Sequence, residues 1–113
     1  MYYTDLDGHS YPAQKHIRQL KGEEVVTWSR SIVSANILEA EAGTNGYHGG
    51  DSGHGARTYL RLADLGSSAM WCRAQDYDGV EILLGGDTEL ATVIEALKWM
   101  VSVLETQSEV RRK

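Results

Sequence analysis

The chain has little of several features that usually organise a small protein. Only one of its 113 residues is a cysteine, Cys72, which excludes an internal disulfide and a Cys-x-x-Cys metal or redox site. We expect Cys72 to be a small buried core residue. No apolar run approaches the roughly 18 residues of a membrane span. The start, Met-Tyr-Tyr-Thr-Asp-Leu-Asp, lacks the basic and apolar regions of a secretion signal. These absences predict a cytoplasmic protein.

Positive charge is also scarce. The chain has 11 lysines and arginines against 16 aspartates and glutamates, for a formal net charge of −5. Coating of DNA or RNA needs a basic surface that displaces counterions, so the charge argues against general nucleic-acid binding. It leaves room for a small phosphorylated ligand held by a few arginines. The length indicates a single domain, residues 1–113, with one modest core.

The first 22 residues carry no strand signal. Residues 1–11 have no regular period, which predicts a loose or draped tail. The only proline, Pro12, stands where a short helix from Gln14 to Leu20 could begin, with Gly22 ending it. The sequence therefore predicts a tail with a short helix before the main domain at residues 23–113.

Strand signals and one long helix follow. Segments 25–28, 37–41, 56–65, 70–73 and 80–84 are β-branched, aromatic or alternating. Within 56–65, the alternation predicts one face toward the core (Thr58, Leu60, Leu62) and an opposite face with two arginines and a tyrosine (Arg57, Tyr59, Arg61). Residues 88–109 form the clearest helix, with Asp87 as its N-cap. The predicted fold is α+β: a mostly antiparallel sheet of four to six strands with a long C-terminal helix packed on one face.

The predicted helix is apolar over a wide arc. One stripe contains Leu90, Ile94, Leu97, Val101 and Leu104, and a second contains Val93, Ala96, Met100 and Val103. Together they cover roughly 180°, whereas packing on a sheet needs about 100°. We expect the surplus to be covered by a partner subunit, at least partly through Val93, Met100 and Val103. The alternative is that the N-terminal tail folds over the helix.

Residues 43–58 are the most informative stretch. Six of the 12 glycines and two of the 4 histidines lie there. A run so rich in glycine cannot be a helix or a central strand. It predicts a shaped loop whose backbone N–H groups could cradle an anion. The plainer alternative is a sharply turning connection between two strands.

The side chains of this loop also allow a metal-site hypothesis. Two imidazoles and a carboxylate, His48, Asp51 and His54, are suitable ligands for zinc or non-haem iron. The glycines between them make a poor rigid scaffold, and Asp51 could simply stabilise a turn. No nucleophile elbow, Walker loop, GxGxxG or HExxH motif is present. We therefore expect no metal, no cofactor and no catalysis.

The residue types favour binding of a small ligand over metal binding or catalysis. Arg57, Arg61 and Arg73 lie on predicted strands, where a guanidinium can be held rigidly and grip a phosphate. Flat side chains on which a base could stack are also at hand (Trp28, Trp71, Tyr47, Tyr59).

Two stretches resemble a known family. The first is the run from Leu38 to Tyr59, with its Gly-Thr-Asn-Gly-x-x-Gly-Gly-Asp-x-Gly-His-Gly-x-Arg-Thr pattern, followed by Ala63-Asp-Leu-Gly66. The second is Leu84-Gly-Gly-Asp-Thr-Glu-Leu90 and the helix to Glu105. Together, over residues 32–109, they resemble small phage and prophage proteins of the anti-Thoeris nucleotide-sponge family. Residues 70–75 and the first 30 or so residues have no counterpart in the resemblance.

The resemblance implies a function. Members of this family are non-enzymatic oligomers, hexameric in form, that sequester cyclic ADP-ribose-type signals made by a bacterial TIR immune enzyme; some also hold cyclic oligonucleotides. The resemblance and the residue chemistry above together predict a cyclic-nucleotide site and a homo-oligomer, and the resemblance implies a hexamer. If the protein is phage-encoded, its expected location is the cytoplasm of the host. No DNA, RNA or membrane partner is expected. The predicted ligand-binding residues are Asn45, Tyr47, Arg57, Thr58, Tyr59, Trp71 and Arg73.

Two alternative functions stay open at this point. An inhibitor of a protein partner, such as an anti-CRISPR, would use the acidic surface as a mimic of nucleic acid. A small metal-dependent hydrolase would use His48, Asp51 and His54.

Overall fold

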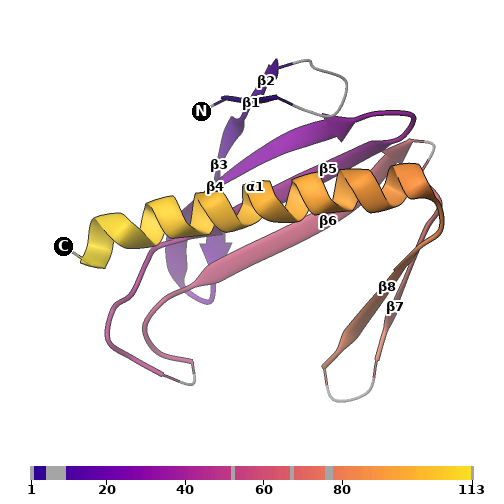
Figure 1. Ribbon diagram of the computed structural model, residues 1–113. Helices are drawn as coiled ribbons and strands as arrows, with labels where there is room; N and C mark the ends of the chain where they lie inside the picture. The colour runs from indigo at the N-terminus through magenta and orange to yellow at the C-terminus, as the bar shows by residue number, and fades with distance from the viewer. Residues whose placement is uncertain (1, 5–9, 52, 67, 76–77, 113) are drawn as a thin grey trace.

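The computed structural model describes residues 2–4, 10–51, 53–66, 68–75 and 78–112 (Figure 1). Eight strands and one helix follow in chain order: β1 (Tyr2–Thr4), β2 (Ser10–Pro12), β3 (Gln14–Leu20), β4 (Glu23–Val33), β5 (Ile37–Thr44), β6 (Thr58–Gly66), β7 (Met70–Ala74), β8 (Val80–Leu84) and α1 (Asp87–Arg112).

One antiparallel sheet organises the molecule. It has the strand order β3-β4-β5-β6, while β1 pairs with β2 and β7 with β8 in two separate two-stranded sheets. Helix α1 crosses one face of the central sheet, over β5 and β4 (Figure 1). This is the α+β fold that the sequence predicts, with the C-terminal helix on one face of the sheet.

The core lies between α1 and the centre of the sheet. Strand β5 alternates, so Leu38, Ala40 and Ala42 face the helix while Glu39 and Glu41 face away. Two of the three helix-facing side chains on β5 are alanines, which lets the helix come close to the strand. The buried cluster contains Ile32, Leu38, Ala40 and Ala42 from the sheet and Ala96, Trp99, Met100 and Val103 from the helix.

The predicted short helix after Pro12 is wrong. Residues 14–20 form β3, which pairs with β4 from Gln14↔Ser29 to Leu20↔Glu23. Lys21 and Gly22 join the two strands with φ of 49° and 88°, the left-handed pair that a tight hairpin turn requires. Gly22 therefore closes a hairpin instead of ending a helix.

Of the two forms predicted for the tail, the loose one is wrong where the tail is described. Residues 2–4 and 10–12 pair as two short antiparallel strands, β1 and β2. Residues 5–9 of the predicted tail lie outside the described residues.

The helix uses its two apolar stripes differently from the prediction. Met100 and Val103 are buried against the sheet, and Val93 packs beside them. The stripe left in solvent is the other one, with exposed fractions of 43–58% at Leu90, Ile94, Leu97 and Val101. The expected surplus of apolar surface is present, but the prediction that Val93, Met100 and Val103 form a subunit interface is wrong.

The edge strand β6 is only partly covered. Leu62 packs against the core, whereas Leu60, on the same face, is 59% exposed because α1 lies over β5 and β4 and leaves the edge strand open. Tyr59 and Arg61 lie on the opposite face, as the alternation predicts. Cys72 is exposed on the β7–β8 hairpin, so the prediction of a buried cysteine is wrong. Within the described ranges, none of the helices has the length and apolar character needed to cross a membrane.

Candidate functional site

The glycine-rich segment between β5 and β6 is a closed, shaped loop. Its two arms cross where Gly50 meets Gly55: a Cβ atom added to Gly50 would lie 2.7 Å from the Gly55 backbone nitrogen. Gly55 also has a φ of +86°, which disfavours any other residue there. The loop's glycines thus serve a close backbone crossing, and the prediction of a shaped loop is confirmed for the described residues 45–51 and 53–57.

Asn45 clamps the root of the loop. Its backbone N–H donates to the Arg57 carbonyl (3.2 Å), and its side-chain oxygen accepts from the Arg57 N–H (2.8 Å). Its side-chain amide also donates to Glu23 Oε1 (2.9 Å) on β4. One asparagine therefore joins both ends of the loop to the hairpin β3–β4.

The loop root is tied to the helix as well. The Gln107 side chain accepts from the Thr44 N–H (2.8 Å) and donates to the Val26 carbonyl (2.9 Å). The hydroxyls of Thr44 and Thr58 lie 3.0 Å apart across the β5–β6 ladder. These contacts fix the last turns of α1 beside the loop.

The Arg57 guanidinium is held loosely at this root. Its Nη1 donates to the Gly55 carbonyl at 3.3 Å, and its Nη2 lies 3.6 Å from Glu23 Oε2. Its Nε is buried and meets no acceptor among the described residues. A buried donor without an acceptor is rare and calls for an explanation. The Arg57 side chain is 18% exposed, so part of the guanidinium still reaches solvent.

A hollow opens between the loop root and the helix. It has a volume of about 220 Å³ and combines hydroxyl groups, backbone and apolar surface. Tyr47, which is 64% exposed, stands at its rim. The lining residues are Thr44, Gly46, Tyr47, Ala56, Thr58, Leu104, Glu105 and Ser108.

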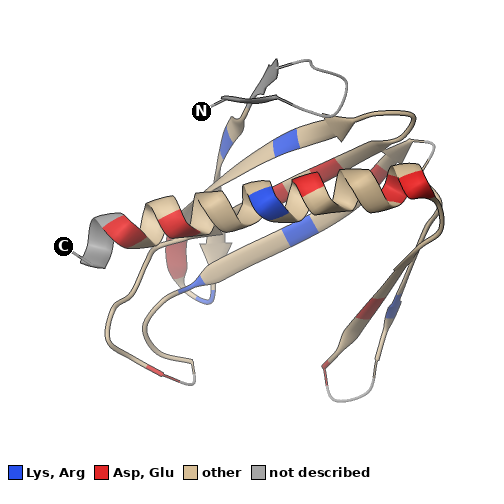
Figure 2. Ribbon diagram, in the orientation of Figure 1, with Lys and Arg blue, Asp and Glu red and all other residues tan. Residues whose placement is uncertain are grey.

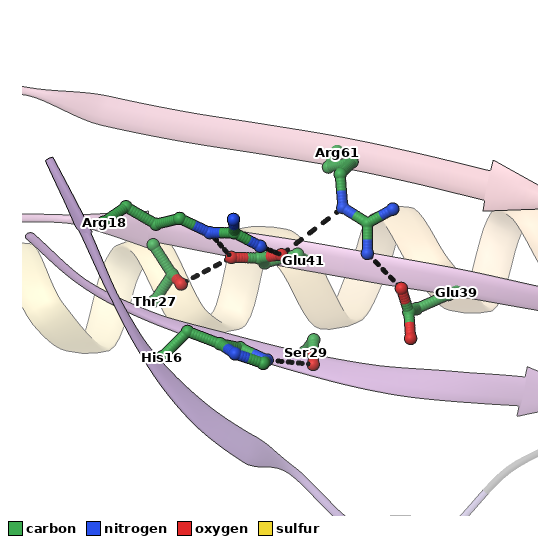
Figure 3. Close-up of polar contacts among 7 residues, drawn as sticks. All are labelled: His16, Arg18, Thr27, Ser29, Glu39, Glu41 and Arg61. Atoms are coloured by element: carbon green, nitrogen blue, oxygen red, sulfur yellow. Dashed lines mark hydrogen bonds and ion pairs between the residues drawn. The ribbon is translucent and has the colours of Figure 1, made fainter. Parts of the chain in front are cut away.

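The sheet face opposite α1 carries a charged network around Glu41 (Figure 3). The Glu41 carboxylate is fully buried and accepts from Arg18 Nε (2.7 Å), Arg18 Nη2 (2.5 Å) and Thr27 Oγ1 (2.6 Å). Arg61 Nε lies 3.4 Å from the same carboxylate. Burial by itself raises the pKa of Glu41, but the hydrogen bonds from Arg18, Thr27 and Arg61 and the charge of Arg18 outweigh it and lower the pKa to about 2.

The other members of this face complete the network. Arg61 also pairs with Glu39, and the Arg18 guanidinium lies over the Tyr59 ring, 5.0 Å from its centroid. His16 Nε2 and Ser29 Oγ are 2.7 Å apart (Figure 3). Arg61 therefore belongs to a set of ion pairs that join three strands, whereas the Arg57 guanidinium has only long contacts among the described residues.

The network was missed in the sequence. The contact of Arg18 with Glu41 was not predicted because residues 14–20 were expected to form a helix. Only a strand places Arg18 beside β4 and within reach of β5. The alternating Glu39 and Glu41 opposite Arg61 were the available signal, because directly paired residues of antiparallel strands share a face.

The predicted site residues fall into three places. Asn45 and Arg57 meet at the loop root, Tyr47 and Thr58 line the hollow, and Tyr59 lies on the charged face. The remaining two predicted residues, Trp71 and Arg73, lie on the β7–β8 hairpin, which projects from the other end of the molecule (Figure 1).

Arg73 and Trp71 are both open to solvent. Arg73 Nε lies 2.6 Å from Glu81 Oε1 in an exposed pair, and Trp71 is 59% exposed. Within one chain, neither residue is brought to the glycine-rich loop.

The three residues of the metal-site hypothesis do not converge. His48 Nε2 is 3.0 Å from the Asn45 carbonyl oxygen, and the His54 backbone N–H donates to the Asp51 carbonyl (3.0 Å). Among the described residues, no three histidine, cysteine, aspartate or glutamate side chains gather as a metal site would require. The geometry therefore gives the hydrolase hypothesis no support.

Charge is distributed unevenly over the two faces. Within residues 87–109, α1 carries five acidic residues (Asp87, Glu89, Glu95, Glu105, Glu109) and one basic residue, Lys98. Figure 2 shows this acidic helix in front of strands that carry both basic and acidic residues. The outer face of the helix is therefore an unfavourable place for an anionic ligand.

Comparisons of the chain with protein-family models, with curated proteins and with solved structures find no match. The likeness to the nucleotide-sponge family stays a prediction.

Proposed function

We propose that the protein is a non-enzymatic phage anti-defence protein that binds and sequesters a cyclic ADP-ribose-type or cyclic-nucleotide immune signal in the host cytoplasm. The binding place is the root of the glycine-rich loop and the adjoining hollow. One observation carries the proposal: Arg57 has a buried Nε without an acceptor among the described residues and only long contacts from its other nitrogens. A phosphate at the solvent-reaching part of the guanidinium would supply Nη2 with the close acceptor that Glu23, at 3.6 Å, does not provide.

The hollow beside the loop root, which Arg57 itself does not line, adds complementary chemistry. One of the Thr44 and Thr58 hydroxyls donates to the other, which leaves one hydroxyl proton for a ribose or phosphate oxygen, and the exposed Tyr47 ring offers a stacking surface. The clamp by Asn45 holds the loop root in place before a ligand arrives, which reduces the entropy lost on binding. Sequestration needs tight binding alone, so no activated water or nucleophile is required.

The first prediction concerns Arg57. Arg57→Ala should weaken binding by about 2–4 kcal/mol, because its removal leaves a desolvated phosphate without its charged partner. Calorimetry with cyclic ADP-ribose and with a cyclic dinucleotide measures this directly. Lys15→Ala removes the same charge from an exposed position on β3 and serves as the control.

The same variant should fold normally. The contact of Arg57 with Glu23 is long and partly exposed, so its loss should cost no more than about 1 kcal/mol of unfolding free energy. Wild-type affinity in Arg57→Ala would remove this residue from the site and return the loop to a purely structural role.

The second prediction concerns metal. Protein purified without chelator should contain no stoichiometric zinc or iron, because His48 and His54 make local contacts and do not converge with Asp51. Elemental analysis of the wild type, His48→Ala and His54→Ala tests this. Stoichiometric metal that is lost in either variant would favour the hydrolase instead.

A further inference from the structure

Glu23 is the first residue of β4 and directly follows the tight turn at Lys21 and Gly22. Its two carboxylate oxygens contact different residues of the loop root. Oε1 accepts from the Asn45 side-chain amide at 2.9 Å, and Oε2 lies 3.6 Å from Arg57 Nη2. The first distance is that of a hydrogen bond, whereas the second is that of a loose ion pair. Asn45, rather than Arg57, therefore fixes the position of the carboxylate.

Asn45 does not account for the negative charge of Glu23. The Asn45 side-chain oxygen accepts from the Arg57 N–H, which leaves its amide nitrogen to donate to Glu23. An amide nitrogen needs only an acceptor oxygen, and the neutral side chain of a glutamine would supply one. The charge of Glu23 therefore acts on the other residue that it approaches, Arg57.

The carboxylate and a bound phosphate would compete for the same nitrogen of Arg57. Glu23 Oε2 faces Nη2, which is also the nitrogen that lacks a close acceptor. A phosphate bound to Nη2 would bring a second negative charge next to the carboxylate, and like charges side by side are unfavourable. The Glu23 side chain is 42% exposed, so water partly screens its contact with Arg57 and the contact breaks at small cost.

The charged face shows what a tighter partner does to an arginine. Glu41 accepts from Arg18 Nε at 2.7 Å and also from Arg18 Nη2, so that edge of the Arg18 guanidinium is closed to another anion. Glu23 forms no such paired hydrogen bonds with Arg57. Its charge compensates a cation whose side chain is mostly buried, and it does so weakly enough to be displaced.

We propose that Glu23 is a built-in competitor for the phosphate of the ligand. It compensates Arg57 in the empty site and gives up this contact when a phosphate binds. The inference rests on the proposed function, because it concerns the site around Arg57, and it makes Glu23 a specificity-determining residue. Every anion has to break the same contact. A phosphoryl group that forms charge-assisted, bidentate hydrogen bonds regains that cost, whereas a singly charged small anion such as chloride does not.

Glu23→Gln tests the proposal, with cyclic ADP-ribose and a cyclic dinucleotide as the probes. The glutamine oxygen can still accept from Asn45, so the variant should keep the circular dichroism spectrum and the urea midpoint of the wild type. With the competing charge removed, calorimetry should show affinity that is higher by about threefold or more. Unchanged or weaker binding would overturn the proposal, and weaker binding would make Glu23 a residue that positions Arg57 for the ligand.

The next residue provides the matched control. Glu24→Gln removes the same charge from an exposed side chain whose contact is with Gln19 and not with the loop root. It should bind both probes as the wild type does. An equal gain in Glu24→Gln would assign the effect to the net charge of the protein and overturn the role of Glu23.

A double-mutant cycle separates competition for Arg57 from direct repulsion of the ligand. In an Arg57→Ala background, studied at protein concentrations that allow the weakened binding to be measured, Glu23→Gln should give no further gain. A gain as large as in the wild-type background would mean that the carboxylate repels the ligand without acting through Arg57, and would overturn the competition.

The proposed function and the role of Glu23 are distinguishable in these measurements. If neither the wild type nor Glu23→Gln binds either probe, both are contradicted. If the wild type binds a probe and Glu23→Gln binds it no more tightly, the proposed function stands and only the competition is contradicted.

Discussion

Met100→Glu is expected to unfold the protein. Met100 is 4% exposed and packs between α1 and the sheet with Trp99 and Val103. A carboxylate there would be buried without a partner, at a cost of about 4 kcal/mol or more. Because the whole stability of a small domain is about 5–15 kcal/mol, the transition in urea, followed by circular dichroism, should shift strongly or disappear.

The neighbouring residue provides the matched control. Val101 is 52% exposed on the outer stripe of α1, so Val101→Glu should keep both the circular dichroism spectrum and the urea transition of the wild type. A folded, monomeric Met100→Glu would contradict the assignment of the two stripes, because it would place Met100 at a subunit interface after all.

Glu41→Gln is expected to remove much of the protein's sensitivity to acid. The folded-state pKa of Glu41 is about 2, against 4.5 for an unperturbed carboxyl. Because the folded pKa is the lower one, the ionised carboxylate contributes stability that is fully present above pH 4.5 and is lost as the pH falls toward 2. A difference of this size corresponds to about 3 kcal/mol.

Urea unfolding between pH 7 and pH 2.5 measures this effect. Relative to the wild type, Glu41→Gln should be less stable at pH 7 by about 3 kcal/mol and should lose less on acidification. Glu24→Gln, at an exposed position on β4, is the control and should follow the wild-type curve. Parallel curves for the wild type and Glu41→Gln would show that the pKa of Glu41 is not lowered by folding and that its ionisation does not stabilise the fold.

The parts of the fold that local pattern decides were predictable from the sequence. The alternation at residues 56–65 and the apolar periodicity at 88–109 correspond to β6 and α1. The strand at residues 14–20 was not predictable from the sequence. A proline before a mixed polar segment suits both a helix start and a strand, and only the pairing with β4 decides between them. Likewise, two adjacent apolar stripes do not reveal which one the sheet covers.

The candidate site was predictable in composition but only partly in arrangement. The loop residues Asn45, Arg57 and Thr58 follow from the glycine-rich stretch that carries them. The contact of Asn45 with Glu23, 22 residues away, depends on the β3–β4 hairpin and leaves no local trace. The separation of Trp71 from Arg57 depends on the direction in which the β7–β8 hairpin projects, which residue chemistry does not determine.

Sequestration requires the protein to hold an intact nucleotide signal. Mass spectrometry can identify the small molecules released when the protein, purified from cells that make such signals, is denatured by heat. We expect an intact cyclic ADP-ribose-type or cyclic nucleotide at close to one molecule per site, and its loss from Arg57→Ala purified in the same way. A hydrolysed product would indicate an enzyme, and the absence of any bound nucleotide would favour a protein partner. Either result would contradict sequestration.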